Sequence, residues 1–178
     1  MGDRIVTPYE GSGARAWDPA APIEAPLRLH EVRVPHAWVD YNGHMSESCY
    51  LLVVGDDSDA FFRYIGIDEA YRAGGHSLYT VETHLRHLGE AAEGEPLALT
   101  IQVLDHDAKR VHVFHTIRQA ETGAVLATAE QMLLHVDSRA GRTTPMPDHL
   151  RDRLRAIGEA HAALGRPDGA GRSIGIGS

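Results

Sequence analysis

The sequence of 178 residues is poor in cysteine, in basic residues and in long apolar runs. Its single cysteine, Cys49, excludes an intrachain disulfide and a zinc site built from several cysteines. A chain without disulfides is typical of a reducing, cytoplasmic compartment. No run approaches the roughly 20 apolar residues of a membrane-spanning helix, and no apolar stretch near the N-terminus resembles a secretory signal. We therefore expect a cytoplasmic protein with no membrane partner.

Basic residues are outnumbered, because 17 Lys and Arg stand against 25 Asp and Glu and give a net charge of −8. A general nucleic-acid-binding protein needs a basic surface that neutralises phosphates, so nucleic acid is not an expected partner. A small ligand that carries phosphates needs only a local basic patch. The apolar content of 43% suffices for a core, and the length fits one domain.

The two ends of the chain differ in composition from its middle. Residues 1–27 contain four prolines among small and charged residues, which predicts an irregular N-terminal arm from which Trp17 docks onto the body. Residues 165–178 contain five glycines and predict a flexible tail. Between them we expect a main domain at 28–138 and a C-terminal helical extension at 139–164.

The middle of the chain alternates between two kinds of apolar periodicity. A period of two predicts strands at 29–34, 77–88, 97–104, 110–118 and 124–136, and helical spacing predicts helices at 42–65, 68–73 and 148–164. Consecutive strands joined by short turns pair antiparallel, and the long helix must cover one face of their sheet. The predicted fold class is α+β, with a curved antiparallel sheet wrapped around a long central helix. The unpaired edge of such a sheet favours dimer formation.

The segment 40–44 lies where the first strand hands over to the long helix. A helix N-terminus offers unpaired N–H groups and a partial positive charge, which suit a developing oxyanion. A carboxylate just before it, here Asp40, can act as nucleophile or as general base toward water. Gly43 allows close approach of backbone to a ligand, and Asn42 and His44 add donors. The alternative is that Asp40 or Asn42 is only a helix N-cap.

Three longer runs carry a resemblance to a known family. They are WVDYNGHMSE (38–47), YTVETH followed by RHL (79–84 and 86–88), and ATAEQMLLHVD (127–137). In these runs the sequence resembles hot-dog fold thioesterases of the 4-hydroxybenzoyl-CoA thioesterase type. It is most similar to the thioesterase domain attached to some bacterial carnitine dehydrogenases, which is associated with hydrolysis of betainyl-CoA. The sequence contains no dehydrogenase portion, in contrast to those proteins.

The resemblance implies a hot-dog fold, an acyl-CoA substrate, no cofactor, and a homodimer or a dimer of dimers. It implies that Asp40 is the catalytic carboxylate and that Asn42 and His44 orient water or the carbonyl. The N–H groups around Gly43 and Met45 would hold the oxyanion. Two interpretations of Glu82 stay open, namely a second active-site carboxylate across a dimer interface and an ordinary ion pair with Arg86.

A betainyl group ends in a trimethylammonium cation, which proteins hold against aromatic faces. The aromatic candidates near the motif are Trp38, Tyr41, Tyr50 and Tyr79. Core positions are the alternative for Tyr50 and Tyr79, and for Tyr79 the core is favoured. Coenzyme A phosphates require basic groups, for which the candidates are Arg86, His87, Lys109 and Arg110. A solvated turn explains Lys109 and Arg110 equally well.

Other functions are less consistent with the sequence. The twelve histidines include two pairs three residues apart, but on a strand that offset points the rings to opposite faces, so no metal site is expected. The Gly-x-Ser-x-Gly match at residues 171–175 lies in the predicted flexible tail and not between a strand and a helix, so a serine hydrolase of the α/β type is not expected. Two alternatives remain, a hot-dog hydratase or dehydratase acting on acyl thioesters and a non-catalytic acyl-CoA-binding module. Release of free thiol distinguishes a hydrolase from both.

Overall fold

The structure is a computed structural model that describes residues 6–11 and 13–176. Its strands are β1 (Leu27–Arg33), β2 (His76–His87), β3 (Pro96–His106), β4 (Arg110–Gln119), β5 (Val125–Asp137) and β6 (Arg142–Thr143). Its helices are α1 (Glu47–Ile65), α2 (Glu69–Ala73) and α3 (Asp148–His161), with short 3-10 helices at His36–Trp38 and Ala162–Leu164. The five long strands and three helices confirm the predicted elements, and β6 is an addition.

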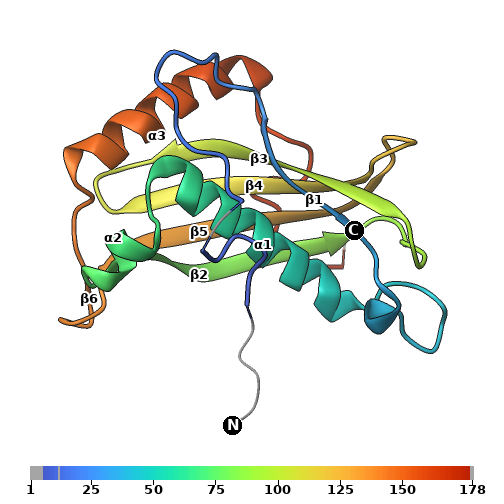
Figure 1. Ribbon diagram of the computed structural model, residues 1–178. Helices are drawn as coiled ribbons and strands as arrows, with labels where there is room; N and C mark the ends of the chain where they lie inside the picture. The colour runs from blue at the N-terminus through green and yellow to red at the C-terminus, as the bar shows by residue number, and fades with distance from the viewer. Residues whose placement is uncertain (1–5, 12, 177–178) are drawn as a thin grey trace, which may run out of the picture.

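The strands form one antiparallel sheet in the order β1-β3-β4-β5-β2, with β6 paired to β5. The sheet curls, and α1 lies across its concave face (Figure 1). Alternate residues of each strand point to this face, and the apolar stripe of α1 packs against them. The helix contributes Val53, Val54, Phe61 and Ile65, all fully buried. The predicted curved sheet around a central helix is therefore confirmed.

The N-terminus of α1 differs from the prediction. The helix begins at Glu47 rather than at residue 42, and Ser46 is its N-cap. The intervening residues form a tight turn, in which the N–H of Asp40 donates to His44 O and the N–H of Gly43 donates to Asp40 O, each at 3.0 Å. Gly43 has φ +83°, a left-handed conformation that glycine adopts without strain. These hydrogen bonds hold the backbone in a turn, so the helix begins five residues after the predicted start at residue 42.

A β-bulge in β2 interrupts the regular alternation of side chains that the predicted period of two implies for that strand. The register with β5 shifts between Thr80 and Glu82, which leaves Val81 as the extra residue. A bulge reverses the alternation of side chains along the strand. Leu78 is buried before the bulge and Thr83 contacts the interior after it. Tyr79 is 50% exposed, so its favoured placement in the core is wrong.

A chain of polar side chains crosses the interface between α1 and the sheet. His115 Nδ1 of β4 donates to Asp57 Oδ2 of α1 at 2.7 Å, and both side chains are fully buried. The other ring nitrogen, Nε2, lies 3.5 Å from Ser58 Oγ. Ser58 donates to Gln131 Oε1 at 3.1 Å, and Gln131 Nε2 donates to Thr83 Oγ1 at 3.1 Å. Because buried polar groups are costly without partners, this chain fixes where along the sheet α1 can lie.

The helix α3 covers half of one sheet edge. β1 pairs with β3 only as far as Ile101, which leaves the rest of β3 without a strand neighbour on the side away from β4. α3 packs along this part (Figure 1), and the N–H of Val103 donates to His161 Nδ1 at 3.0 Å. The opposite ring nitrogen of His161 donates to Glu24 O at 3.0 Å. Burial lowers the pKa of His161, in agreement with a neutral ring that has one acceptor and one donor nitrogen.

Both ends of the described chain contact the body. In the arm, the Trp17 ring lies 5.3 Å from that of Tyr64, with the Arg153 guanidinium 5.6 Å from the Trp17 ring, as predicted for Trp17. Gly165 O accepts from Gln102, and the N–H of Gly171 donates to Glu130. Residues 1–5, 12 and 177–178 of the predicted arm and tail lie outside the described residues. In the described part of the chain, none of the helices is long and apolar enough to cross a membrane.

The His161→Ala substitution should lower the free energy of unfolding by about 2 kcal/mol, because it leaves the buried N–H of Val103 without an acceptor. Urea unfolding measures the loss. Arg155→Ala is the control, since this residue of the same helix makes only an exposed ion pair with Asp152, and it should change stability by less than about 0.5 kcal/mol. Equal effects of the two substitutions would contradict a role for His161 in closing the edge.

Two adjacent aspartates of α1 should respond in opposite ways to the same substitution. Asp57→Asn weakens the buried charge-assisted bond to His115 and should cost about 2 kcal/mol. Burial and, to a smaller extent, the nearby Asp59 raise the pKa of Asp56 to about 6. Above that pH the folded state holds an ionised carboxylate that it disfavours, so Asp56→Asn should stabilise the protein by about 1 kcal/mol at pH 8 after allowance for solvent screening.

The sign of the Asp56 effect follows from the raised pKa. The wild-type carboxyl contributes stability when it is protonated, below its unfolded value, and this contribution is lost as the pH rises through about 6. The gain from Asp56→Asn should therefore be smaller at pH 5 than at pH 8, whereas the loss from Asp57→Asn should be present at pH 8. Urea unfolding of both variants at pH 5 and pH 8 tests this, and a loss of stability in both at pH 8 would show the assignment of Asp56 to be wrong.

Candidate active site

The turn at 38–46 and the loop at 88–92 form one unit next to the start of α1. The N–H of Met45 donates to Ala91 O at 2.8 Å, and His44 forms a β-bridge with Ala92. The hydroxyl of Tyr50, in the first turn of α1, donates to Gly89 O at 3.3 Å. Segments more than forty residues apart are thus held together by backbone contacts.

The Asp40 carboxylate sits in the middle of this turn. Its Oδ1 accepts the N–H of Asn42 at 2.8 Å, the geometry of an Asx turn. Among the described residues, Oδ2 has no hydrogen-bond partner, and the side chain is only partly buried. Because Ser46 is the N-cap of α1, the interpretation of Asp40 or Asn42 as that cap is wrong. Asp40 therefore presents an oxygen with free lone pairs in the turn that precedes the helix.

Some backbone amides around the turn already donate hydrogen bonds, and others have no acceptor. Those of Gly43 and Met45, the two predicted for the oxyanion, donate to Asp40 O and Ala91 O. The amides of Glu47 and Ser48 begin α1, where no intrahelical acceptor exists. Ser46 makes no side-chain capping bond to them, and within the described residues neither has another acceptor. The free donors of the site are therefore in the first turn of the helix.

His44 has a carboxylate neighbour that the sequence did not reveal. Its Nε2 lies 3.4 Å from Glu90 Oε2, and both side chains reach the surface. Glu90 follows the predicted strand at 77–88 and belongs to none of the recognised polar motifs. Only the fold brings the loop after β2 against the turn before α1, so no signal in the sequence identified this residue.

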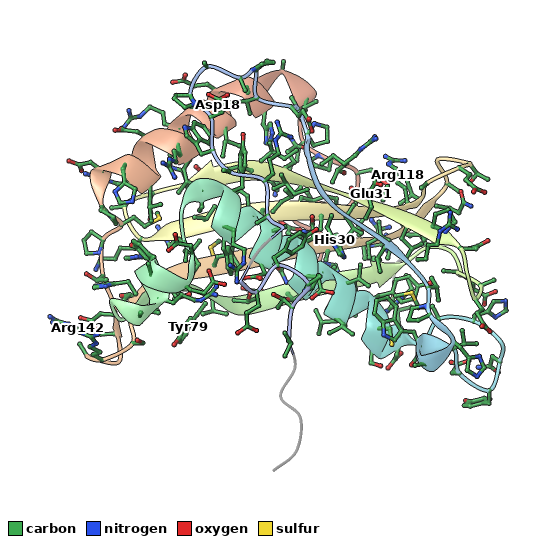
Figure 2. The ribbon with its side chains drawn as sticks, viewed as in Figure 1. Asp18, His30, Glu31, Tyr79, Arg118 and Arg142 are labelled. Atoms are coloured by element: carbon green, nitrogen blue, oxygen red, sulfur yellow. The ribbon has the colours of Figure 1, made fainter. Side chains whose placement is uncertain are left out.

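The four aromatic candidates are not brought together in one protomer. Tyr50 is buried with its ring 5.0 Å from that of His87, and burial raises the pKa of its hydroxyl. Trp38 is half-buried and Tyr41 is 97% exposed. Figure 2 shows Tyr79 at the opposite end of the sheet, near Arg142 and away from the start of α1. Within one protomer, Trp38 and Tyr41 are thus the aromatic candidates near Asp40 that keep exposed surface, because Tyr50 is buried and Tyr79 is distant.

The basic candidates also separate into two groups. Arg86 and His87 end β2 and lie next to the 88–92 loop. Lys109 and Arg110 lie at the turn between β3 and β4, at the end of the sheet where Tyr79 lies. Arg110 pairs with Asp107 at 2.6 Å, and this bond raises the pKa of the guanidinium.

Glu82 lies near the middle of β2, and its predicted alternative partner is not bound to it. Among the described residues no ion pair joins Glu82 to Arg86, whose guanidinium instead packs against Gly169 of the tail. Glu82 lines a shallow cavity of about 280 Å³ on the convex face of the sheet, together with His84, His112 and Glu130. No group of three or more described His, Cys, Asp or Glu side chains is placed to hold a metal ion.

The curled antiparallel sheet, its central helix and the polar turn at the helix start define an α+β protein of the hot-dog class. The model of one family, the Thioesterase-like superfamily, matches residues 34–154. The chain therefore belongs to the Thioesterase-like superfamily. The matched region includes the turn at 38–46, the whole of α1 and the five strands β2 to β6.

Relatives named for a function are similar to most of the chain. A protein of Rhizobium meliloti named L-carnitine dehydrogenase/betainyl-CoA thioesterase is 52% identical over 90% of this chain and 34% of its own length. The chain thus spans about a third of that relative. A Pseudomonas aeruginosa protein named betainyl-CoA thioesterase is 44% identical over 84% of this chain and 95% of its own. A solved structure of a putative thioesterase from Pseudomonas putida KT2440 is 33% identical, with a TM-score of 0.75 over 86% of this chain and 98% of that one.

Proposed function

We propose that this protein is a thioester hydrolase that cleaves an acyl-CoA, betainyl-CoA above all, into the free acid and coenzyme A. The observation that carries the proposal is the Asp40 carboxylate, which has an oxygen without a hydrogen-bond partner among the described residues and lies in the turn immediately before the free amides that begin α1. Relatives 44% and 52% identical that are named for betainyl-CoA thioesterase support the choice of acyl group.

The proposed reaction uses this pair of groups. Asp40 either attacks the thioester carbonyl carbon itself or removes a proton from the water that attacks it. In both routes the carbonyl oxygen gains negative charge, which the amides of Glu47 and Ser48 stabilise at the positive end of α1. The C–S bond then breaks, and the thiolate of coenzyme A leaves and takes up a proton. Water completes the hydrolysis by adding its oxygen to the acid, and it restores Asp40 if an anhydride formed. Asn42 and His44 orient the water or the carbonyl.

The active unit in this proposal is a homodimer joined at β2. Among the described residues this strand has β5 as its only strand neighbour, so its outer edge presents unpaired backbone groups. Val81 and Tyr79 of the strand are 54% and 50% exposed. Antiparallel pairing of two copies would place the Tyr79 end of one β2 beside the Arg86 end of the other. Tyr79 and Glu82 of the partner subunit would then approach a site from which they are distant within one protomer.

Asp40→Asn should reduce the release of free thiol from betainyl-CoA by at least about a thousand-fold, because the amide can neither attack nor accept a proton. A colorimetric thiol assay with betainyl-CoA, 4-hydroxybenzoyl-CoA and short straight-chain acyl-CoAs measures it. Asp152→Asn, at an exposed pair on α3, is the matched control and should retain full activity. Near-normal turnover in Asp40→Asn would contradict the role of Asp40, and no thiol release by the wild type would favour the hydratase or the binding module.

Val81→Glu should convert the dimer to monomer and reduce thiol release, because it places a like charge on each side of the proposed β2 contact. Light scattering after size-exclusion chromatography measures the mass. Val6→Glu is the control, since Val6 is a similarly exposed apolar residue on the arm, 59% exposed. A variant at Val81 that keeps the dimeric mass would exclude β2 as the interface.

A further inference from the structure

The two segments that build the candidate site are free of basic residues. Residues 34–62 and 87–108 contain no Lys or Arg, although the chain has 17. They include the turn at 38–46, most of α1 and the 88–92 loop. The fixed charges carried by these two segments are therefore carboxylates, apart from histidines. The nearest arginines along the chain are Arg33, which donates to Gly94 O at 3.0 Å, and Arg86, which packs against Gly169 of the tail. A positively charged acyl group would experience a favourable potential here, and an anionic one would not.

Within this environment Glu90 has a distinct position. Its carboxylate lies 3.4 Å from His44 Nε2, and its side chain is 74% exposed. The next two glutamates along the chain are engaged elsewhere, since Glu93 pairs with His36 at 3.0 Å and Glu95 accepts the N–H of Ala92 at 3.1 Å. Backbone contacts from Gly89, Ala91 and Ala92 to the turn and to α1 hold Glu90 in place.

A betainyl thioester carries a positive charge close to its reacting carbonyl, and this charge requires a negatively charged group near Asp40. Its nitrogen is two bonds from the carbonyl carbon, so the cation must lie beside the groups that act on the carbonyl. In one protomer, Tyr50 is buried and Tyr79 is distant, which leaves Trp38 and Tyr41 as the only aromatic candidates there. Aromatic faces attract such cations weakly when they are exposed to water, and a carboxylate adds to the attraction.

We propose that Glu90 is a specificity-determining residue that selects acyl-CoAs with a cationic acyl group. This inference rests on the proposed function, because it concerns the acyl group of the same site. The carboxylate of Glu90 faces the trimethylammonium group while the thioester carbonyl lies between Asp40 and the first amides of α1. Uncharged acyl groups of the same shape fit equally well but gain no electrostatic attraction.

The test compares two substrates of one shape, betainyl-CoA and the uncharged tert-butylacetyl-CoA. In both, three methyl groups surround the atom two bonds from the carbonyl carbon, and only the charge differs. The readout is the ratio of kcat/KM for the charged substrate to that for the uncharged one. Glu90→Gln should lower this ratio about five-fold, the size of an exposed charge interaction. Glu93→Gln, three residues further along the chain but paired with His36, should leave the ratio unchanged.

Each outcome has one meaning. A ratio that falls in Glu90→Gln and not in Glu93→Gln supports the proposal. Equal losses for both substrates in Glu90→Gln would overturn it, because they would mean that Glu90 acts only by positioning His44. An unchanged ratio with unchanged rates would overturn it as well. Wild-type protein that releases thiol from neither substrate would instead refute the proposed function, so the two failures are distinguishable.

Discussion

The hydrogen bond between His115 and Asp57 is the interaction on which the arrangement of the site depends. It joins the middle of α1 to the middle of the sheet at 2.7 Å, with both side chains fully buried. Apolar packing alone is non-directional and would tolerate small shifts of a helix along a curved sheet. A buried polar pair has one favourable geometry, and here Ser58, Gln131 and Thr83 extend it. The position of the N-terminus of α1 follows from this contact.

A second constraint acts at the start of the helix. The turn at 38–46 and the 88–92 loop are joined by backbone hydrogen bonds, so the carboxylate of Asp40 is presented by a rigid unit. Because the backbone of the turn is occupied with its own bonds, the helix begins at Glu47 and its first amides stay free. The same local structure therefore places the carboxylate and leaves the donors available. Glu90 belongs to the loop of this unit, and its carboxylate contacts His44 of the turn.

The two edges of the sheet differ in how their backbone groups are covered. β1 and α3 together close the β3 edge, and His161 accepts a backbone N–H that would otherwise be unpaired. The β2 edge stays open in the described protomer and carries exposed Tyr79 and Val81. An open edge next to a site whose candidate residues lie at both ends of β2 is consistent with a site shared between two copies.

Apolar periodicity in the sequence alone determined the five long strands, the three helices and the fold class. The spacing of buried residues within one strand or helix is a local property, so it is visible in the order of the amino acids. The turn residues Asp40 to His44 were also identifiable, since they break that periodicity with chemically suitable side chains. The start of α1 and the bulge at Val81 were not, because backbone hydrogen bonds that have no sequence period decide both. The contact of Glu90 with His44 and the buried pair of Asp57 with His115 join residues about fifty positions apart. Only the tertiary structure decided them, since a side chain's partner depends on which distant segment the fold places beside it.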